Sequence, residues 1–224
     1  NNIMAISKFN YNSFNVTPVA SKAIAFNADA DGFTTATATA LTHIKTITAS
    51  ADATVSFVNG VSDVVLDDTY PVYVFKFINV HPATAGSILK VNFSDDTSSH
   101  AYNLSKQTTH FYARHDEDGS DGSLVYSTSS DLSNSTSDQE IVLNTNNNNN
   151  SSASGELTLF SPASTTFIKH FMTKNNSDGE SSRCYTTYAD GYVNTTAAVT
   201  AVQFTYGGAN IDAGTFKLYG IKDS

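Results

Sequence analysis

Residues 70–82 read YPVYVFKFINVHP. Between Val72 and Val80 almost every residue is β-branched or aromatic, which is the composition that packs best on a pleated sheet. Pro71 lacks an N–H group for the ladder, so it can only begin a strand, and Pro82 ends it. Because side chains alternate between the two faces of a strand, this stretch predicts a central strand covered on both sides for most of its length. The two faces hold Val72, Val74, Lys76, Ile78 and Val80 on one side and Tyr73, Phe75, Phe77 and Asn79 on the other.

The residues before this stretch carry a strong turn signal. Asn59-Gly60 lies between Val55–Val58 and a second apolar segment that begins at Val61, and Asn-Gly is typical of a type I′ hairpin turn. The second segment ends at Asp67-Asp68, a further turn that leads into the central strand. We therefore expect residues 43–80 to form an antiparallel meander.

The composition predicts an all-β chain. Of 224 residues, 40% are hydrophobic and 15% charged, with 14 Phe, 11 Tyr and no Trp, which favours sheet over helix and argues against disorder. Short strand patterns recur along the chain without an amphipathic helix, and long polar connections separate them. We expect a single antiparallel β-sandwich, jelly-roll-like, over residues 21–224. Residues 1–20 are expected to be an N-terminal arm or edge strand, and the Asn/Ser-rich residues 144–152 an exposed loop.

Charge and hydropathy restrict the partners. The net charge is −9 and only Arg114 and Arg183 are arginines, so we expect no nucleic-acid partner. No run of 18 apolar residues is present, so membrane insertion is not expected. Residues 1–3 precede Met4, and no pattern typical of a secretory signal follows, so a signal is absent or was removed. The single cysteine, Cys184, excludes an intrachain disulfide and is expected to be a buried small hydrophobe.

One acidic stretch is a candidate metal site. Residues 115–122 read HDEDGSDG, and clustered carboxylate oxygens are what Ca²⁺ prefers. Asp116, Asp118 and Asp121 are the candidate calcium ligands. The alternative is a solvated hairpin loop, which the two glycines in the stretch suit equally well.

No catalytic signature is present. The sequence has no Gly-x-Ser-x-Gly elbow, P-loop or dinucleotide fingerprint, and none of the six histidines has zinc-site spacing. The acidic residues lie mostly in predicted turns, whereas a glycosidase needs paired carboxylates on core strands. We therefore expect no enzymatic activity and, calcium apart, no cofactor.

The C-terminal residues 210–221, NIDAGTFKLYGI, resemble the terminal motif of a family of small virion structural proteins in tailed phages of marine and other aquatic bacteria. The resemblance covers most of the chain from about residue 40, and its motifs are strand and turn chemistry. It implies a β-sandwich component of a phage particle, located at the virion surface. The other segments that carry it are LTHIKTITAS at 41–50, VSFVNGVSDVVLDDTYPVYVFKFINVHPA at 55–83, LTLFSPASTTFIKHF at 157–171 and GYVNTT at 191–196.

The resemblance leads to three alternatives for function. The first is a capsid decoration or cement protein, a homo-oligomer, with a trimer as the expected state, that contacts the major capsid protein. The second is a module attached to tail or baseplate proteins, an adhesin that binds host surface glycans through the loops at 116–122 and 144–152. The chain has no heptad or repeat that could form a long shaft, which argues against a complete tail fibre. The third is a carbohydrate-active enzyme or free lectin.

Overall fold

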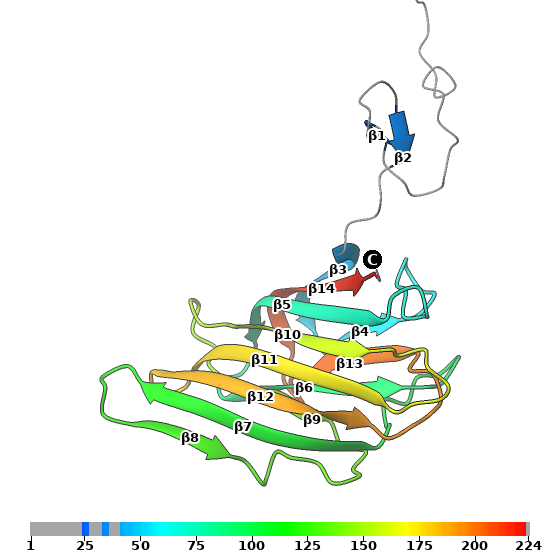
Figure 1. Cartoon of the computed structure of the whole chain (residues 1–224). Coiled ribbons are helices and arrows are strands. Elements are labelled where there is room, and N and C mark those ends of the chain that lie inside the picture. The colour runs from blue at the N-terminus through cyan, green and yellow to red at the C-terminus, as the bar shows by residue number, and fades with distance from the viewer. Residues whose placement is uncertain (1–23, 27–32, 36–40, 223–224) are drawn as a thin grey trace, which may run out of the picture. The chain divides into compact units, whose positions relative to one another are not determined.

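The computed structural model describes residues 24–26, 33–35 and 41–222, which divide between two compact units, 1–40 and 41–224 (Figure 1). The division lies after residue 40, whereas the boundary expected from the sequence lies after residue 20. In the first unit, β1 (Ile24–Phe26) pairs antiparallel with β2 (Phe33–Thr35). The arm expected at residues 1–20 lies outside the described residues. No helix of the described residues is long and apolar enough to cross a membrane.

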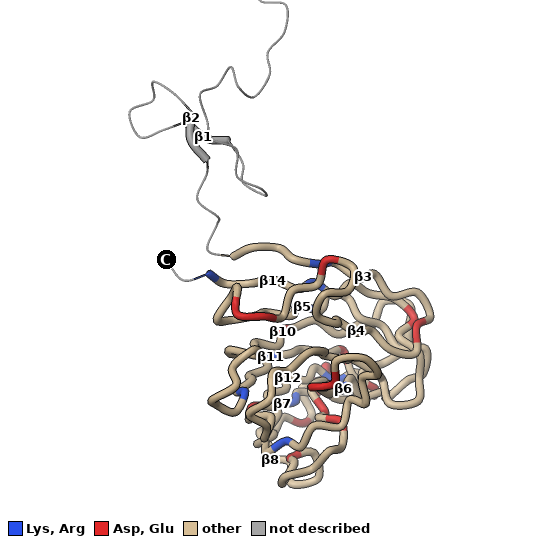
Figure 2. The backbone as a smooth tube through the Cα atoms, turned by 90° about the vertical axis from the view of Figure 1, so that its right-hand side faces the viewer, with Lys and Arg blue, Asp and Glu red and all other residues tan. Residues whose placement is uncertain are grey.

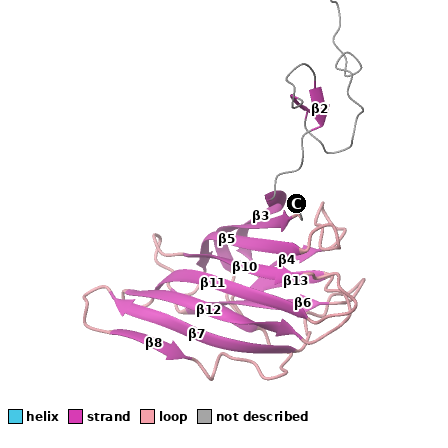
Figure 3. Ribbon diagram, in the orientation of Figure 1, coloured by secondary structure: helices cyan, strands magenta, loops and turns pink. Residues whose placement is uncertain are grey.

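The second unit is built from antiparallel strands joined by loops, so the predicted all-β antiparallel class is confirmed (Figure 3). The description as a sandwich or jelly roll stays a prediction. The strands are β3 (Leu41–Asp52), β4 (Thr54–Val58), β5 (Val72–Pro82), β6 (Ser87–Ser94), β7 (Lys106–Asp116), β8 (Gly122–Tyr126), β9 (Gln139–Thr145), β10 (Ala153–Phe160), β11 (Lys169–Gly179), β12 (Arg183–Val193), β13 (Ala201–Thr205) and β14 (Ile211–Ile221).

These twelve strands form one hydrogen-bonded sheet that consists of two runs. The long run has the order β3-β14-β5-β10-β11-β12-β7-β8, and the short run has the order β9-β6-β13-β4. The runs are joined where Thr145 of β9 pairs with Gly179 of β11. The sheet therefore turns back on itself at this junction, and the short run lies behind the long run in Figure 1.

Aromatic side chains from both runs fill the space between them. Phe57 of β4 meets Phe75 of β5 with ring centroids 5.3 Å apart, and Phe93 of β6 meets Phe171 of β11 at the same separation. All four rings are at most 1% exposed. Each such ring contributes about 1.5–3 kcal/mol by leaving water, so these contacts hold the two runs face to face.

The central position of β5 is confirmed, because it pairs with β14 on one edge and β10 on the other. Phe75 and Phe77 are buried as predicted. Asn79 has a left-handed φ of 51° and forms a bulge, since β5 has one more residue here than either neighbour. Beyond the bulge Val80 joins the core cluster of Phe75 and Phe77 instead of the opposite face, where Ile78 is 40% exposed. The second face is thus less covered than expected.

The predicted meander over residues 43–80 is wrong. β3 pairs with β14 and β4 pairs with β13, so neither pairs with the strand that follows it in sequence. A turn forms at Asn59-Gly60, with Val61 N–H donating to the Val58 carbonyl oxygen (3.1 Å), but no strand returns from it. The predicted type I′ geometry is wrong, because Gly60 has a left-handed φ (77°) and Asn59 does not. Instead the chain continues in further turns, in which Gly60 N–H donates to the Val64 carbonyl oxygen (2.9 Å). Val64 and Leu66 are buried in the core. Burial of these two side chains replaces the hairpin ladder that the local pattern favoured.

The Asn-rich loop connects β9 to β10, which pair one after the other with the same edge of β11. Asp178 of β11 accepts a hydrogen bond from Asn146 N–H (3.0 Å) and donates its own N–H to the Ser152 carbonyl oxygen (3.2 Å). The loop therefore leaves and rejoins the sheet at one residue, and β10 continues along the edge of β11 that β9 leaves. Residues 147–150 are exposed, as expected for this part of 144–152, whereas Thr145 and Ser151 at its ends are buried.

Candidate functional site

The structure does not bring the three candidate calcium ligands together. Asp116 binds Arg183, with Nε 2.7 Å from Oδ1, and Asp121 binds Arg114, with Nη2 2.5 Å from Oδ2. Asp118 accepts a hydrogen bond from Ser120 N–H (2.9 Å), and its hydrogen bonds with Ser120 lower its pKa. No group of three or more His, Cys, Asp or Glu side chains that could hold a metal ion occurs among the described residues. The segment forms the turn of the β7–β8 hairpin, which is the alternative that the sequence left open.

Cys184 is exposed rather than buried, so that prediction is wrong. Cys184 stands at an outward position of β12, and its inward neighbour Tyr185 is 4% exposed. The Asn176 side-chain amide donates to Cys184 Sγ (3.2 Å). The sequence misled because strand alternation, and not the apolar character of the thiol, decides which neighbour enters the core.

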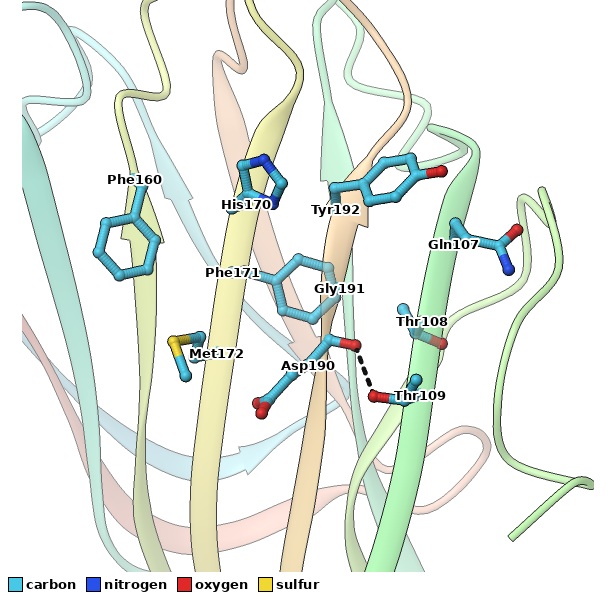
Figure 4. Close-up of a pocket in the computed structure, with 10 residues that line it drawn as sticks. All are labelled: Gln107, Thr108, Thr109, Phe160, His170, Phe171, Met172, Asp190, Gly191 and Tyr192. Carbon is cyan, nitrogen blue, oxygen red and sulfur yellow. Dashed lines mark hydrogen bonds between the residues drawn. The ribbon is translucent and has the colours of Figure 1, made fainter. Parts of the chain in front are cut away.

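A groove crosses the outer face of the long run, over β10, β11, β12 and β7 (Figure 4). Its volume is about 490 Å³, within the range of small-ligand sites. Buried Phe171 and Thr108 lie beneath it. We call it the outer groove. The side chains at its surface are Phe160, His170, Met172, Asp190, Tyr192, Gln107 and Thr109.

The outer groove follows from strand alternation. In β11 the residues from Lys169 to Gly179 alternate between buried and accessible positions, which leaves His170 and Met172 outside. The same alternation in β12 leaves Asp190 and Tyr192 outside. Between them Gly191 is the one residue that fits, because a Cβ there would clash with the carbonyl oxygen of Gln107.

The β11–β12 ladder opens beneath the outer groove. Regular pairing stops at Phe171 opposite Gly191 and resumes at Asn175 opposite Thr187. In the gap Thr173 N–H donates to Asp190 Oδ1 (2.9 Å). Thr173 Oγ1 also donates to the Ala189 carbonyl oxygen (3.1 Å) and accepts from Ala189 N–H (2.9 Å). Side chains thus replace backbone partners in this gap, and the Thr173 N–H holds the Asp190 carboxylate in place.

The carboxylate of Asp190 is held through one of its two oxygens. Its Oδ1 is occupied by Thr173, its backbone carbonyl accepts from Thr109 Oγ1 (3.4 Å), and its Oδ2 has no hydrogen-bond partner among the described residues (Figure 4). A fixed carboxylate oxygen at the surface of a groove is an acceptor for ligand hydroxyl or amine groups.

Aromatic rings lie side by side across the outer groove. His170 and Tyr192 are register partners with ring centroids 6.0 Å apart and planes at 68°. Phe160 lies on the other side of His170, since Leu159 pairs with Phe171 one position away (Figure 4). Gln107 pairs with Tyr192 from β7, and its side-chain oxygen accepts from Asn134 N–H (3.2 Å). Three rings therefore lie in a row over β10, β11 and β12, with Gln107 next to the row on β7.

Charge is sparse around this face. Figure 2 shows acidic and basic positions scattered along a backbone that is otherwise uncharged. The outer groove holds one carboxylate, Asp190, and neither Lys nor Arg lines it. Lys106 belongs to β7 but is fully buried: its Nζ donates to Asn92 Oδ1 (2.6 Å) and the Leu104 carbonyl oxygen (2.7 Å). Burial lowers the pKa of Lys106 to about 8.

Sequence reasoning missed the outer groove because no motif marks it, although Tyr188, Asp190 and Tyr192 repeat at the spacing of two that places them on one face of a strand. Which face is open could not be read from that spacing, because the neighbouring strands come from distant parts of the chain. Comparison with known proteins found no matching family model and no curated protein or solved structure with significant similarity to the chain.

Proposed function

We propose that this protein is a non-enzymatic structural protein at the surface of a phage particle, in the first place a head decoration protein. The proposal rests on the resemblance of residues 210–221 and the associated segments to small virion proteins of tailed phages. The observation that carries it is where these segments lie in the sheet. They are scattered over the sequence, yet they fall on the adjacent strands β3, β14, β5, β10, β11 and β12, with β4 as the one member outside that series.

A shared scaffold is the simplest account of that placement. β14, which contains the terminal motif, lies between β3 and β5, and its Phe216 and Leu218 are at most 1% exposed. Residues that build a scaffold determine the fold rather than a chemical reaction. The resemblance therefore supports a common structural role, and we propose that the role is to cap and strengthen the capsid as a homo-oligomer, with a trimer as the expected state.

A second candidate is a tail- or baseplate-attached module that binds host surface glycans. The outer groove favours it, because this groove offers aromatic rings and an oriented carboxylate on an open sheet face. From the sequence alone, the loops 116–122 and 144–152 are the expected receptor contacts. For this candidate we propose the outer groove in their place.

A glycan-degrading enzyme is the third alternative, and the outer groove gives it less support than binding. Most glycoside hydrolases use two carboxyl groups about 5–10 Å apart, and Asp190 is the one carboxylate among the residues that line the outer groove. We propose binding without cleavage.

Gold-labelled antibody on intact virions, viewed by electron microscopy, tests the placement. Label over the whole head is expected for a decoration protein, and light scattering of the purified chain should then show a homo-oligomer. Label at the tail tip would replace the first candidate by the second. Particles that carry no label, with denatured particles as the control for epitope access, would overturn both.

A further inference from the structure

We propose that the outer groove binds a neutral polysaccharide chain, with sugar rings against the aromatic row and sugar hydroxyls on Asp190. The inference rests on the second candidate function for its biological setting and names the ligand class of that site. It makes a separate claim about the purified protein, which is tested without a virion.

The first argument is the geometry of the aromatic row. Phe160, His170 and Tyr192 occupy adjacent register positions on β10, β11 and β12. Neighbouring strands lie about 4.8 Å apart, so the three side chains span about 10 Å across the sheet. Pyranose rings carry an apolar C–H face and a rim of hydroxyl groups. A row of rings beside polar groups matches both parts of such a ligand.

The second argument is the polar rim. Asp190 Oδ2 is free to accept, while Oδ1 is held by Thr173 N–H at 2.9 Å. On the other side of Tyr192, Gln107 uses its oxygen for Asn134, which leaves its amide N–H groups available to a ligand. A purely apolar ligand would leave these groups desolvated without partners, which costs binding free energy.

The third argument is the length of the aromatic surface. From Asp190, the same face of β12 continues to Tyr188, which stacks on Phe111 of β7 with ring centroids 4.9 Å apart and planes at 11°. Phe111 pairs in turn with Tyr126 of β8, which is 53% exposed. Aromatic side chains thus extend from β10 to β8 with Asp190 in the middle. A surface of this extent fits a chain of sugars better than a single sugar.

Charge and backbone pairing argue against two other ligand classes, acidic polymers and extended peptides. No Lys or Arg lines the outer groove and the chain carries a net charge of −9, so phosphate backbones and acidic glycans are repelled. An extended peptide binds by adding to a free sheet edge, but the outer groove lies over strands that are already paired on both sides. A neutral glycan needs neither a cation nor a free edge.

Affinity electrophoresis of the full chain tests the proposal. The probes are the neutral polysaccharides dextran, laminarin, mannan and xylan, with alginate as the acidic probe, each cast in a native gel. We expect retardation by at least one neutral polysaccharide and none by alginate. Absence of retardation by every neutral probe, or retardation by alginate alone, would overturn the proposal.

Variants locate the site. Tyr192→Ala and His170→Ala should each weaken binding roughly tenfold, because a lost aromatic contact is of that order. Asp190→Asn should keep the hydrogen bond from Thr173 and weaken binding by a similar factor, since an amide oxygen is a poorer acceptor than a carboxylate. Lys217→Ala, on the same sheet face at β14, is the matched control and should bind like the parent chain.

Thermal unfolding of each variant must match the parent before its binding is compared, and His170, which is exposed, keeps the test independent of folding. Binding that survives both ring variants would place the ligand elsewhere and overturn the assignment. The immunogold result separates this inference from the proposed function. Labelled virions without polysaccharide binding would refute the ligand, whereas binding without labelled virions would refute the placement.

Discussion

One buried ring, Phe75, joins three strands of the core. Its ring is 1% exposed and lies 5.3 Å from Phe57 of β4 and 5.7 Å from Phe204 of β13. We expect Phe75→Ala to lower the free energy of unfolding by about 3–5 kcal/mol, because the cavity loses contacts with both rings. Urea denaturation measures it. Ile78→Ala, on the same strand but 40% exposed, should cost less than about 1 kcal/mol, and equal losses in the two variants would contradict the burial described here.

Because Lys106 is buried, we expect the free energy of unfolding to depend on pH in the alkaline range. Burial lowers the pKa of Lys106 from 10.5 to about 8. Between these values the unfolded chain still holds the proton that the folded chain has released, so stability rises with pH. We expect the parent chain to gain about 2–3 kcal/mol over Lys106→Met between pH 7 and pH 10, measured as the difference in urea unfolding. Parallel pH profiles of the two proteins would contradict the lowered pKa.

Single residues show where sequence reasoning succeeds and fails. The burial of Phe75 follows from composition and alternation alone. The carboxylates of Asp116 and Asp121 were candidates for calcium because only their own segment was visible, and their partners Arg183 and Arg114 decide otherwise. Arg183 lies on a different strand, so the ion pair that occupies Asp116 could not be read from the acidic stretch.

We expect the Asn-rich loop to be dispensable for stability because of how its ends are held. Asn146 and Ser152 both bond to Asp178, so the sheet edge is nearly continuous without the residues between them. Deletion of residues 147–150, which keeps both of these residues, should change stability by less than about 1 kcal/mol, since loop length costs little and the ends already meet. Urea denaturation checks this. Deletion of residues 64–68 is the contrasting control, since it removes buried Val64 and Leu66 and should destabilise strongly.

The position of a strand in the sequence could be predicted better than the strands with which it pairs. The strand at residues 72–82 was expected from its residues, because composition and two prolines act locally. The meander was not realised, because β3 and β4 find their partners in β14 and β13, far along the chain. The outer groove was missed for the same reason: β10, β11, β12 and β7 each contribute a few side chains, and nothing in one strand identifies the others.

For the molecule as a whole, the last strand completes the sheet. β14 lies between β3 and β5 and carries buried Ile211, Phe216 and Leu218. A chain truncated after residue 210 should lose its cooperative unfolding transition, because β3 loses its sheet partner and β5 one of its two. Near-ultraviolet circular dichroism during urea titration measures this. A chain ending at residue 222 is the control, and a truncated chain that still unfolds cooperatively would contradict the pairing described here.

The order of that sheet also predicts slow folding. Most of its contacts join residues far apart in sequence. In particular, β3 near the start of the sheet pairs with β14 at the end of the chain, so the ladder of β3 forms only when these distant segments meet. Antiparallel β proteins with such pairings fold in about milliseconds to seconds, more slowly than helical bundles. Stopped-flow refolding of the full chain should therefore show its main phase in that range.

The pairing of β3 with β14 has one more consequence. Leu41, the first residue of the second unit's sheet, is the register partner of Ile221, near its end. Antiparallel partners lie about 4.5–5.5 Å apart, so a short linker could close this unit into a ring. Opened again within residues 147–150, the ring would become a circular permutant with the same strands in the same places. A protein fused to the new terminus would then lie next to the loop that is anchored at Asp178, and not next to Leu41. The outer groove would be unchanged.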